Sequence, residues 1–304
     1  MSFGESHGAA MGVVIDGITA GLPFFLEKLQ WELSRRSPGK SLSTSSRKEP
    51  DEAEILSGIF QGKTLGSPIA VLVRNKDQRQ EDYQKMKDSY RPGHADRTTI
   101  LKYKIRDYRG GGRSSGRETV SRVIAGYFAS LIIPEVEVVA FIKKLGPFTF
   151  AHPVAELPEV NDYLYDLKKK GESVGGQIGI TLKHCPAGLG EPAFDKLKAD
   201  FAKALLSIGG CVGFSYGASE RFMEKPGREI SKDINNFGGM EGGISNGNSI
   251  EMQAVFKPTS TVGQNALEGR HDPCILPRVL PVAEAMVKFV LADHFLRQNA
   301  YKSS

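Results

Sequence analysis

The chain has 304 residues, of which 40% are hydrophobic and 25% are charged, a composition that is typical of folded globular proteins and excludes extensive disorder. Forty basic and 35 acidic residues give a formal charge of +5, which suits an anionic small ligand or a nucleic acid. No apolar stretch reaches the roughly 20 residues that cross a bilayer, and no charged-then-apolar signal pattern opens the chain.

Predicted strands and helices alternate irregularly along the chain. Short runs rich in Val or Ile and bounded by turn-forming residues predict strands at residues 12–15, 69–73, 137–142, 177–182 and 250–256. Helical spacing of apolar residues predicts helices at residues 25–35, 117–131, 162–170, 193–206 and 280–296. The second helix carries one apolar face, whereas the last is apolar on more than one side, so we expect it to lie deep between layers.

This order of elements indicates an α+β fold with mixed sheets, because no regular strand-helix-strand alternation is present. Pro, Gly and Ser are spread throughout, and no linker, low-complexity tract or repeat divides the chain. We therefore expect a single domain over residues 1–304.

The cysteines indicate a reducing compartment. Cys185, Cys211 and Cys274 show no CxxC spacing for zinc or redox chemistry, and three thiols cannot all pair within one chain. We expect a cytoplasmic protein with reduced thiols, no metal site and no membrane anchor.

Two glycine-rich runs imitate phosphate-binding loops without meeting their spacing. Between Gly58 and Gly62 lie three residues where a Walker A loop needs four. The run from Gly110 to Gly116 does not satisfy GxGxxG, and no convincing parallel strand precedes it. Neither a P-loop nor a dinucleotide-binding fold is expected.

Two histidines lie in glycine-containing loops where a ligand can approach the backbone. Ser6 and His7 stand between two glycines, and His94 follows a Pro-Gly pair between Arg91 and Asp96. Both imidazoles are candidates for proton transfer. The alternatives are a turn with a solvated histidine for the first and a loop histidine tied to Asp96 for the second.

Three further segments concentrate charge and hydroxyl groups. Residues 110–117 place serines and arginines directly before a helix, where free backbone N–H groups and the helix dipole attract anions. Residues 257–261 end a strand with a cation, a proline and three hydroxyls, which suits a polar cofactor or a solvated turn. Residues 269–274 bring arginine, histidine and aspartate to the start of the last helix.

Taken together and in this order, these segments resemble the chorismate synthase family. The matching stretches cover nearly the whole chain: GESHG (4–8), SRRSPGK (34–40), Arg47, LSGIFQGKTLGSPIA (56–70), NKDQRQEDY (75–83), RPGHAD (91–96), RDYRGGGRSSGRET (106–119), PAGLGEP (186–192), GGISNG (242–247), KPTST (257–261) and GRHDPC (269–274). No single stretch would suffice, but their joint presence in register is highly specific.

The resemblance implies a cytoplasmic homotetramer of single-domain subunits, each a β-α-β sandwich. The implied reaction is elimination of phosphate from 5-enolpyruvylshikimate 3-phosphate in the shikimate pathway of aromatic amino acid biosynthesis. It requires reduced FMN without net redox change. No nucleotide-binding module is visible, so we expect the flavin to be reduced by an outside source. NADP is part of the same expectation.

The resemblance also implies roles for individual residues. His7 would donate a proton to the leaving phosphate, His94 would protonate the reduced flavin, and Asp272 would help to relay the substrate hydrogen. Substrate anions would be held by Ser6, Arg36, Arg47, Arg91, Ser115, Arg117 and Arg270. Flavin contacts would come from Arg113, Ser114, Ser115, Gly209, Gly210, Gly242, Lys257, Pro258, Thr259, Ser260, Thr261 and Arg270.

The chain departs from the family pattern in several places. It begins at Met1 immediately before GESHG, so an edge strand is expected to be missing there. Leu42 stands where arginine is common, Gly116 stands where alanine is typical, and Gly209-Gly210 replaces a usual Asn-Ala pair. The stretches after Gly146 and between Lys257 and Arg270 look shorter than usual.

Two rival functions come from other classes of protein. A flavin- or phosphate-binding protein without turnover would keep the arginine turns but would need none of His7, His94 and Asp272. An RNA-binding protein would need an aromatic platform beside its arginine loops, and none accompanies them. We therefore expect no nucleic-acid partner.

Overall fold

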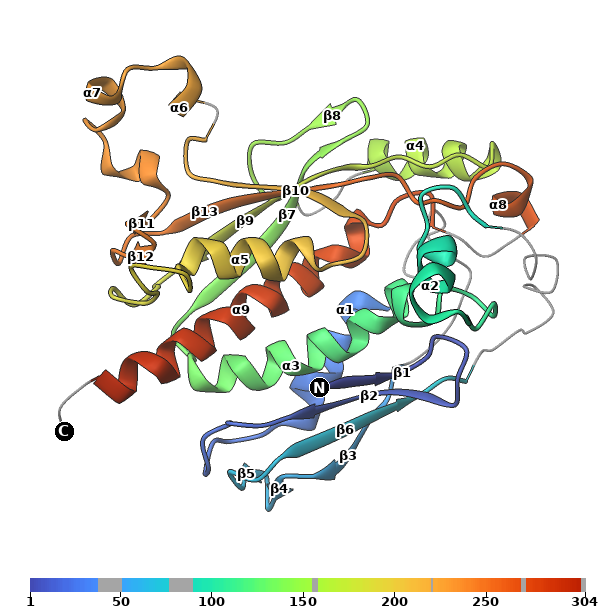
Figure 1. The fold of residues 1–304 in the computed structure, drawn as a ribbon, viewed down its shortest axis with the longest axis horizontal. Coiled ribbons are helices and arrows are strands. Elements are labelled where there is room, and N and C mark those ends of the chain that lie inside the picture. The colour runs from blue at the N-terminus through green and yellow to red at the C-terminus, as the bar shows by residue number, and fades with distance from the viewer. Residues whose placement is uncertain (38–50, 77–89, 155–157, 220, 269–271, 302–304) are drawn as a thin grey trace.

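The computed structural model describes residues 1–37, 51–76, 90–154, 158–219, 221–268 and 272–301. Its core is a layer of helices with a β-sheet on either side (Figure 1). This arrangement confirms the α+β prediction.

The first sheet has four strands in the order β1-β2-β6-β3. These strands are β1 (Ser2–Gly4), β2 (Ala10–Ile15), β6 (Ile69–Arg74) and β3 (Ala53–Ser57). β1 pairs with β2 at the edge of the sheet, so an edge strand is present although the sequence led us to expect none. The short hairpin of β4 (Ile59–Phe60) and β5 (Lys63–Thr64) lies beside this sheet.

The second sheet has five strands in the order β10-β13-β9-β7-β8. They are β10 (Cys211–Tyr216), β13 (Ile250–Phe256), β9 (Gly176–Lys183), β7 (Glu137–Leu145) and β8 (Phe148–Thr149). A separate hairpin joins β11 (Met240–Glu241) to β12 (Ile244–Ser245).

The prediction of mixed sheets was wrong, since every strand pair within the described residues is antiparallel. The reason is visible in β13, where buried and more exposed residues alternate along the strand. That alternation is typical of antiparallel sheets with one covered face, whereas buried parallel strands read as continuous apolar runs.

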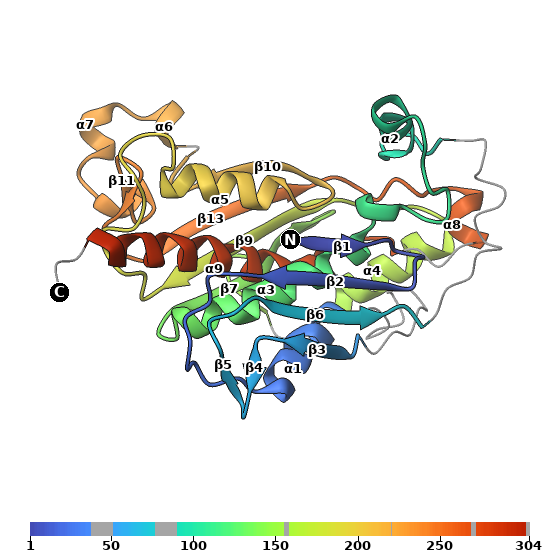
Figure 2. The ribbon, with the colours of Figure 1, turned by 60° about the horizontal axis from the view of Figure 1, so that its bottom comes forward.

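The helix layer consists mainly of α1 (Leu26–Arg36), α3 (Thr119–Ile132) and α9 (Leu276–Tyr301), with α5 (Leu197–Leu206) packed beside α9 (Figure 2). α3 contacts the first sheet at β2, and α9 contacts the second sheet at β7 and β9. α3 and α9 cross closely at Gly126, where an added Cβ would lie 2.3 Å from Cβ of Ala285. The prediction that the last helix lies between layers is confirmed.

The remaining helices are peripheral or short: α2 (Asp96–Tyr103), α4 (Pro158–Lys169), α6 (Arg221–Glu224), α7 (Gly227–Ile230) and α8 (Gln264–Glu268). Single 3₁₀ turns occupy residues 112–114, 116–118 and 234–237. Within the described residues, no helix combines the length and the apolar character needed to span a membrane.

Candidate active site

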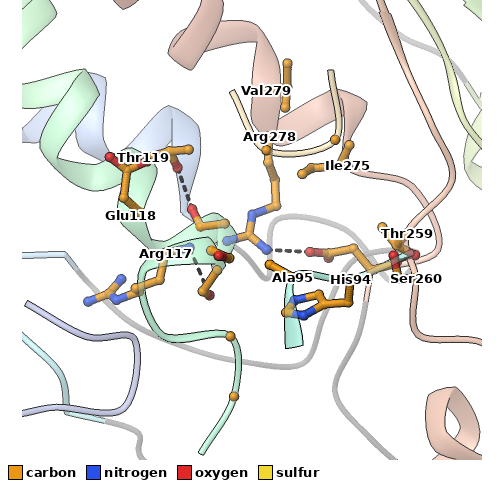
Figure 3. A pocket seen from close by; sticks show the side chains of 18 of the residues that line it. His94, Ala95, Arg117, Glu118, Thr119, Thr259, Ser260, Ile275, Arg278 and Val279 are labelled. Carbon is orange, nitrogen blue, oxygen red and sulfur yellow. Dashed lines mark hydrogen bonds and ion pairs between the residues drawn. The ribbon is translucent and has the colours of Figure 1, made fainter. Parts of the chain in front are cut away.

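A cavity of about 710 Å³ opens where the first turn of α9 meets the loops before α2 and α3 (Figure 3). Its volume lies within the roughly 300–1,000 Å³ of small-molecule sites. Five stretches and two single residues from α1 and the N-terminal loop line it: 91–95, 110–122, 207–210, 257–261, 272–282, Arg36 and His7. The structure thus gathers segments that are up to 275 positions apart, as His7 and Val282 are, around one space.

The glycine-rich turn before α3 lets two imidazoles approach its backbone closely. Gly110 has φ +80°, and an added Cβ there would lie 2.5 Å from Nδ1 of His7. An added Cβ at Gly111 would lie 3.3 Å from Cε1 of His94. Side chains at these two positions would displace the rings, so glycine is needed for the histidines to flank the turn.

The same turn ends in a serine cap. Ser115 is the N-cap of the 3₁₀ turn at 116–118, and its Oγ accepts a hydrogen bond of 3.3 Å from the backbone N of Arg117. The Arg117 side chain reaches the end of β6, where its Nε donates to Oδ1 of Asn75 at 2.9 Å.

A buried ion cluster lies behind the cavity wall. Nη2 of Arg36 and Nη1 of Arg117 each donate to one carboxylate oxygen of Asp51. Asp51 and Arg36 are both 1% exposed. Among the residues that the structure describes, Nε and Nη1 of Arg36 have no hydrogen-bond partner. Buried guanidinium donors are seldom left unpaired, so these two atoms are ready to bind an anion.

Asp51 was not singled out in the sequence because its role depends on contacts distant in the chain. Its burial raises the pKa of the carboxyl, but the guanidiniums of Arg36 and Arg117 more than offset this, so that the pKa of Asp51 falls to about 2. Burial in turn lowers the pKa of Arg36, an effect that Asp51 opposes.

We expect this carboxylate to make stability depend on pH below 4. Its pKa is about 2 in the folded chain, against an ordinary value of 3.8, so its contribution to stability is complete above pH 4 and is lost as the pH falls through 2. Above pH 4 the carboxylate contributes about 2 kcal/mol to the free energy of unfolding. Urea unfolding of wild type and Asp51→Asn should therefore show a stability difference that is smaller at pH 2.5 than at pH 5. An equal difference at both pH values would contradict this expectation.

His94 lies in a loop held by Asp96. Its Nδ1 is 2.9 Å from Oδ1 of Asp96. The other carboxylate oxygen, Oδ2, accepts a hydrogen bond of 2.9 Å from Nε of Arg91. Burial lowers the pKa of His94, as do Arg91 and Lys257, while Asp96 opposes the shift. The predicted tie between His94 and Asp96 is present, and the ring nevertheless lines the cavity.

His7 is 5% exposed and lines the cavity, while Ser6 is fully buried behind it. Oγ of Ser6 lies 3.1 Å from Nδ1 of His7. Ser6 therefore contacts the imidazole and does not itself line the cavity.

The opposite wall carries the predicted hydroxyl-rich segment. Nζ of Lys257 donates to Oγ of Ser260 at 2.7 Å, and Oγ1 of Thr259 donates to the backbone O of Asp272 at 3.1 Å. Asp272 accepts an ion-paired hydrogen bond from Nη1 of Arg278. The segments 257–261 and 272–282 are thus tied together at the start of α9.

Arg278 is a lining residue that the sequence reasoning missed. It extends from the first turns of α9 toward the loop that carries His94 and Ala95 (Figure 3). Its Nε also donates to the backbone O of Arg36 at 3.3 Å. A single cation near the start of an otherwise apolar buried helix was the signal that could have revealed it.

Most predicted site residues meet in this cavity. Those that line it are His7, Arg36, Arg91, His94, Arg113, Ser114, Ser115, Arg117, Gly209, Gly210, Lys257, Pro258, Thr259, Ser260, Thr261 and Asp272. Gly242 does not line it and lies in the turn of the β11–β12 hairpin, which Figure 1 shows at the opposite end of the molecule from α8. Arg47, Arg270 and Leu42 fall outside the described residues.

Comparison with known proteins gives a consistent answer. The family model described as chorismate synthase matches residues 1–296. Proteins named chorismate synthase from Flavobacterium psychrophilum and Thermosynechococcus vestitus are 42% and 44% identical to this chain, covering 99% and 98% of it and 96% and 95% of their own lengths. A solved structure titled "Crystal Structure of Chorismate Synthase" superposes with a TM-score of 0.78 at 28% identity, covering 98% of this chain and 91% of its own.

The alignment with the Flavobacterium protein extends over 341 positions although the chain has 304 residues, so the relative carries internal segments that this chain lacks. This agrees with the expectation of shortened stretches, without locating them. Despite these internal differences, the alignment covers 99% of this chain and 96% of the relative. The chain therefore belongs to the chorismate synthase family.

Proposed function

We propose that the chain is a carbon-oxygen lyase that eliminates phosphate from 5-enolpyruvylshikimate 3-phosphate to give chorismate, with reduced FMN as cofactor. One observation carries the proposal: a single cavity is lined by buried Arg36, two of whose guanidinium nitrogens have no partner among the described residues, and by two histidines that flank the same glycine turn. A substrate with two carboxylates and a phosphate needs such donors, and departure of phosphate needs a nearby acid.

The lining residues fit a flavin. Lys257 and the hydroxyls of residues 259–261 offer donors to a polar ring edge or a phosphate, and Arg113 is 38% exposed, so that it can reach a ligand. An added Cβ at Gly209 or Gly210 would meet nothing within 4 Å, which leaves open space along that wall. When bound, reduced flavin supplies electron density to the substrate as phosphate leaves.

In the proposed reaction Arg36, Arg91, Arg117 and Ser115 hold the substrate anions. Ser6 fixes the His7 ring, which donates a proton to the phosphate. The buried Asp51 keeps Arg36 and Arg117 in place and offsets one of their charges. Arg47 and Arg270 stay predicted anion contacts.

On the opposite wall, Asp272 takes part in the removal of the substrate hydrogen. Its place beside residues 257–261 puts a carboxylate next to the proposed flavin segment. His94 exchanges a proton with the cofactor. Gly242 stays a predicted flavin contact.

The deciding experiment is anaerobic turnover of 5-enolpyruvylshikimate 3-phosphate with chemically reduced FMN, followed by release of phosphate and absorbance of chorismate. Oxidised FMN without a reductant serves as the control and should give no product. Binding of FMN without phosphate release under reducing conditions would instead support the non-catalytic flavin-binding alternative.

We expect oxidised FMN to bind at least about tenfold more tightly when substrate is present. The substrate's anions would neutralise the cluster around Arg36 and so complete the wall that the flavin contacts, which is a coupling of about 1.4 kcal/mol. Linkage requires flavin to tighten substrate binding by the same factor. Fluorescence titration with and without substrate measures the effect, and equal affinities would show that the two sites are not in contact.

We further propose that residues 1–304 form one domain and that four such chains assemble as a cytoplasmic homotetramer supplied with reduced flavin by an outside reductant. Both sheets pack on one helix layer, which supports the single domain. Light scattering during size-exclusion chromatography measures the assembly, and a mass near that of one chain would contradict the tetramer.

A further inference from the structure

The loop before α2 surrounds one carboxylate with an unusual number of donors. Asp96, the first residue of α2, is 6% exposed. Its Oδ2 accepts from Nε and the backbone N of Arg91 at 2.9 and 3.1 Å. Its Oδ1 lies 2.9 Å from Nη2 of Arg91, 2.9 Å from Nδ1 of His94 and 3.2 Å from Nη1 of Arg106.

Counting hydrogens locates the proton of the His94 ring. Nη2 of Arg91 carries two hydrogens, and two acceptors lie within reach: Oδ1 of Asp96 at 2.9 Å and the backbone O of Gly110 at 3.1 Å. Nη2 also lies 3.1 Å from Nδ1 of His94, but no hydrogen is left for that contact. A bare Nδ1 would therefore direct its lone pair at a carboxylate oxygen 2.9 Å away, whereas a protonated Nδ1 donates to it.

We infer that Asp96 is a positioning residue that keeps the proton of His94 on Nδ1 and so presents Nε2 to the cavity as a hydrogen-bond acceptor. Within the described part of the chain, Nε2 has no hydrogen-bond partner of its own. The carboxylate fixes both the ring orientation and the tautomer, because the bond made by one imidazole nitrogen decides which nitrogen is free.

The ring has little freedom to turn away from this arrangement. Gly111 lies against Cε1 on one side, as described above, so the ring edge abuts the glycine turn. Gly93 has φ +70°, and an added Cβ there would lie 3.6 Å from Oγ of Ser260 and 3.8 Å from Nζ of Lys257. The histidine loop is thus packed between the two walls of the cavity.

The charged groups around the ring favour its neutral form. Burial, Arg91 and Lys257 lower the pKa of His94, and Asp96 opposes them without reversing the shift. A ligand entering the cavity therefore meets an acceptor, so its first contact with Nε2 must come from an N–H or O–H donor. Nε2 can act as a proton donor only after it has taken up a proton from that ligand or from solvent, which turns the imidazole into an imidazolium.

This orientation predicts which ligand groups suit the site. The ring N–H of a reduced flavin or the O–H of a phosphate monoester would be matched to Nε2, and a bare carbonyl would not. The consequence for turnover rests on the proposed function, whereas the tautomer itself does not.

Nitrogen NMR of the full chain tests the tautomer directly. The chain has only six histidines, so ¹⁵N-histidine labelling gives a simple solid-state spectrum, and the His94 signals are assigned by their loss in His94→Ala. At a pH where the ring is neutral, we expect Nδ1 to be protonated and Nε2 to be bare. His294 offers an internal contrast, because its Nε2 faces Oδ2 of Asp200 at 2.8 Å and should carry the proton. A proton on Nε2 of His94 would overturn the inference.

Asp96→Asn tests the positioning role. Oδ2 of Asp96 accepts two hydrogen bonds from Arg91, so the single oxygen of asparagine should take that position. The amide NH2 would then face Nδ1 of His94, which can meet it only as an acceptor, and the proton should move to Nε2. We expect kcat to fall at least about tenfold while KM changes less than threefold, since proton transfer is disturbed more than anion binding.

Asp200→Asn is the matched control, because it alters another histidine–aspartate contact, between α5 and α9, outside the cavity lining. It should leave the His94 signals and kcat unchanged. An unchanged His94 tautomer and an unchanged kcat in Asp96→Asn would refute the role of Asp96. If that variant fails to fold, the wild-type spectrum still decides the tautomer, and a wild type without turnover would count against the proposed function alone.

Discussion

His94→Ala is expected to lower anaerobic turnover by about 10²- to 10⁴-fold, the range typical of losing a general acid or base. The structure gives a reason to expect an intact fold, because Asp96 would keep its bonds to Arg91 and Arg106 after the imidazole is removed. FMN affinity should change by less than about tenfold, since one ring contact is lost among many lining groups. Turnover and FMN titration on the same sample measure both effects.

His152→Ala is the suitable control for this variant. His152 is exposed and does not line the cavity, so its removal should alter neither turnover nor flavin affinity. If His94→Ala turns over as fast as this control, His94 has only a structural role in its loop. A joint loss of turnover and of flavin binding would instead assign His94 to cofactor binding.

Each of the five strands predicted from the sequence is present, because apolar runs bounded by turn residues depend on local chemistry, whereas β1, β3, β8 and β10 of the two main sheets were not predicted. The strands expected at 177–182 and 250–256 appear as β9 (Gly176–Lys183) and β13 (Ile250–Phe256). β10 (Cys211–Tyr216) was missed because glycine and serine interrupt it, and only its pairing with β13 makes it a strand.

Helix ends were predicted less well because they depend on backbone geometry. The helix expected from residue 193 begins at Leu197, since Phe194 has φ +56°, which no helix accommodates. The helix expected at 280–296 extends over Leu276–Tyr301 in spite of Pro281. Burial on nearly all its sides stabilises it beyond what local propensity indicates.

The sequence predicted the site from its glycine turns and arginines. It did not predict the residues that hold those arginines and the start of α9 in place, Asp51 and Arg278. Asp51 contacts Arg117 and Arg278 contacts the backbone of Arg36, residues that are far apart in the chain, and neither Asp51 nor Arg278 stands in a distinctive local pattern. Contacts across 66 positions, as between Asp51 and Arg117, follow from the packing of the helix layer on the first sheet. They become visible only when the fold is known.

The second large effect is expected for Asp272→Asn, where structural and catalytic roles make different predictions. Asp272 is bound through its carboxylate to Arg278 and through its backbone O to Thr259. The amide oxygen of asparagine can still accept from Arg278, and the backbone bond is unaffected. Stability should therefore fall by only about 1 kcal/mol or less, the usual net value of one hydrogen bond.

Turnover should fall far more if the carboxylate takes part in the removal of the substrate hydrogen. An amide of nearly the same shape lacks both the negative charge and the proton-accepting oxygen, so we expect a loss of roughly a hundredfold or more. Asp195→Asn provides the matched control, because it changes another aspartate–arginine pair, whose arginine, Arg297, lies on α9 and outside the cavity lining.

Melting temperature and anaerobic turnover, measured on both variants, separate the two roles. Asp195→Asn should leave turnover at the wild-type level. An intact melting temperature with lost turnover in Asp272→Asn would place this carboxylate in the chemistry, since its hydrogen bond to Arg278 can persist while its charge cannot. Wild-type values for both quantities would make Asp272 a turn residue that only anchors Arg278. The proposed flavin segment at residues 257–261 would then have no catalytic base in Asp272.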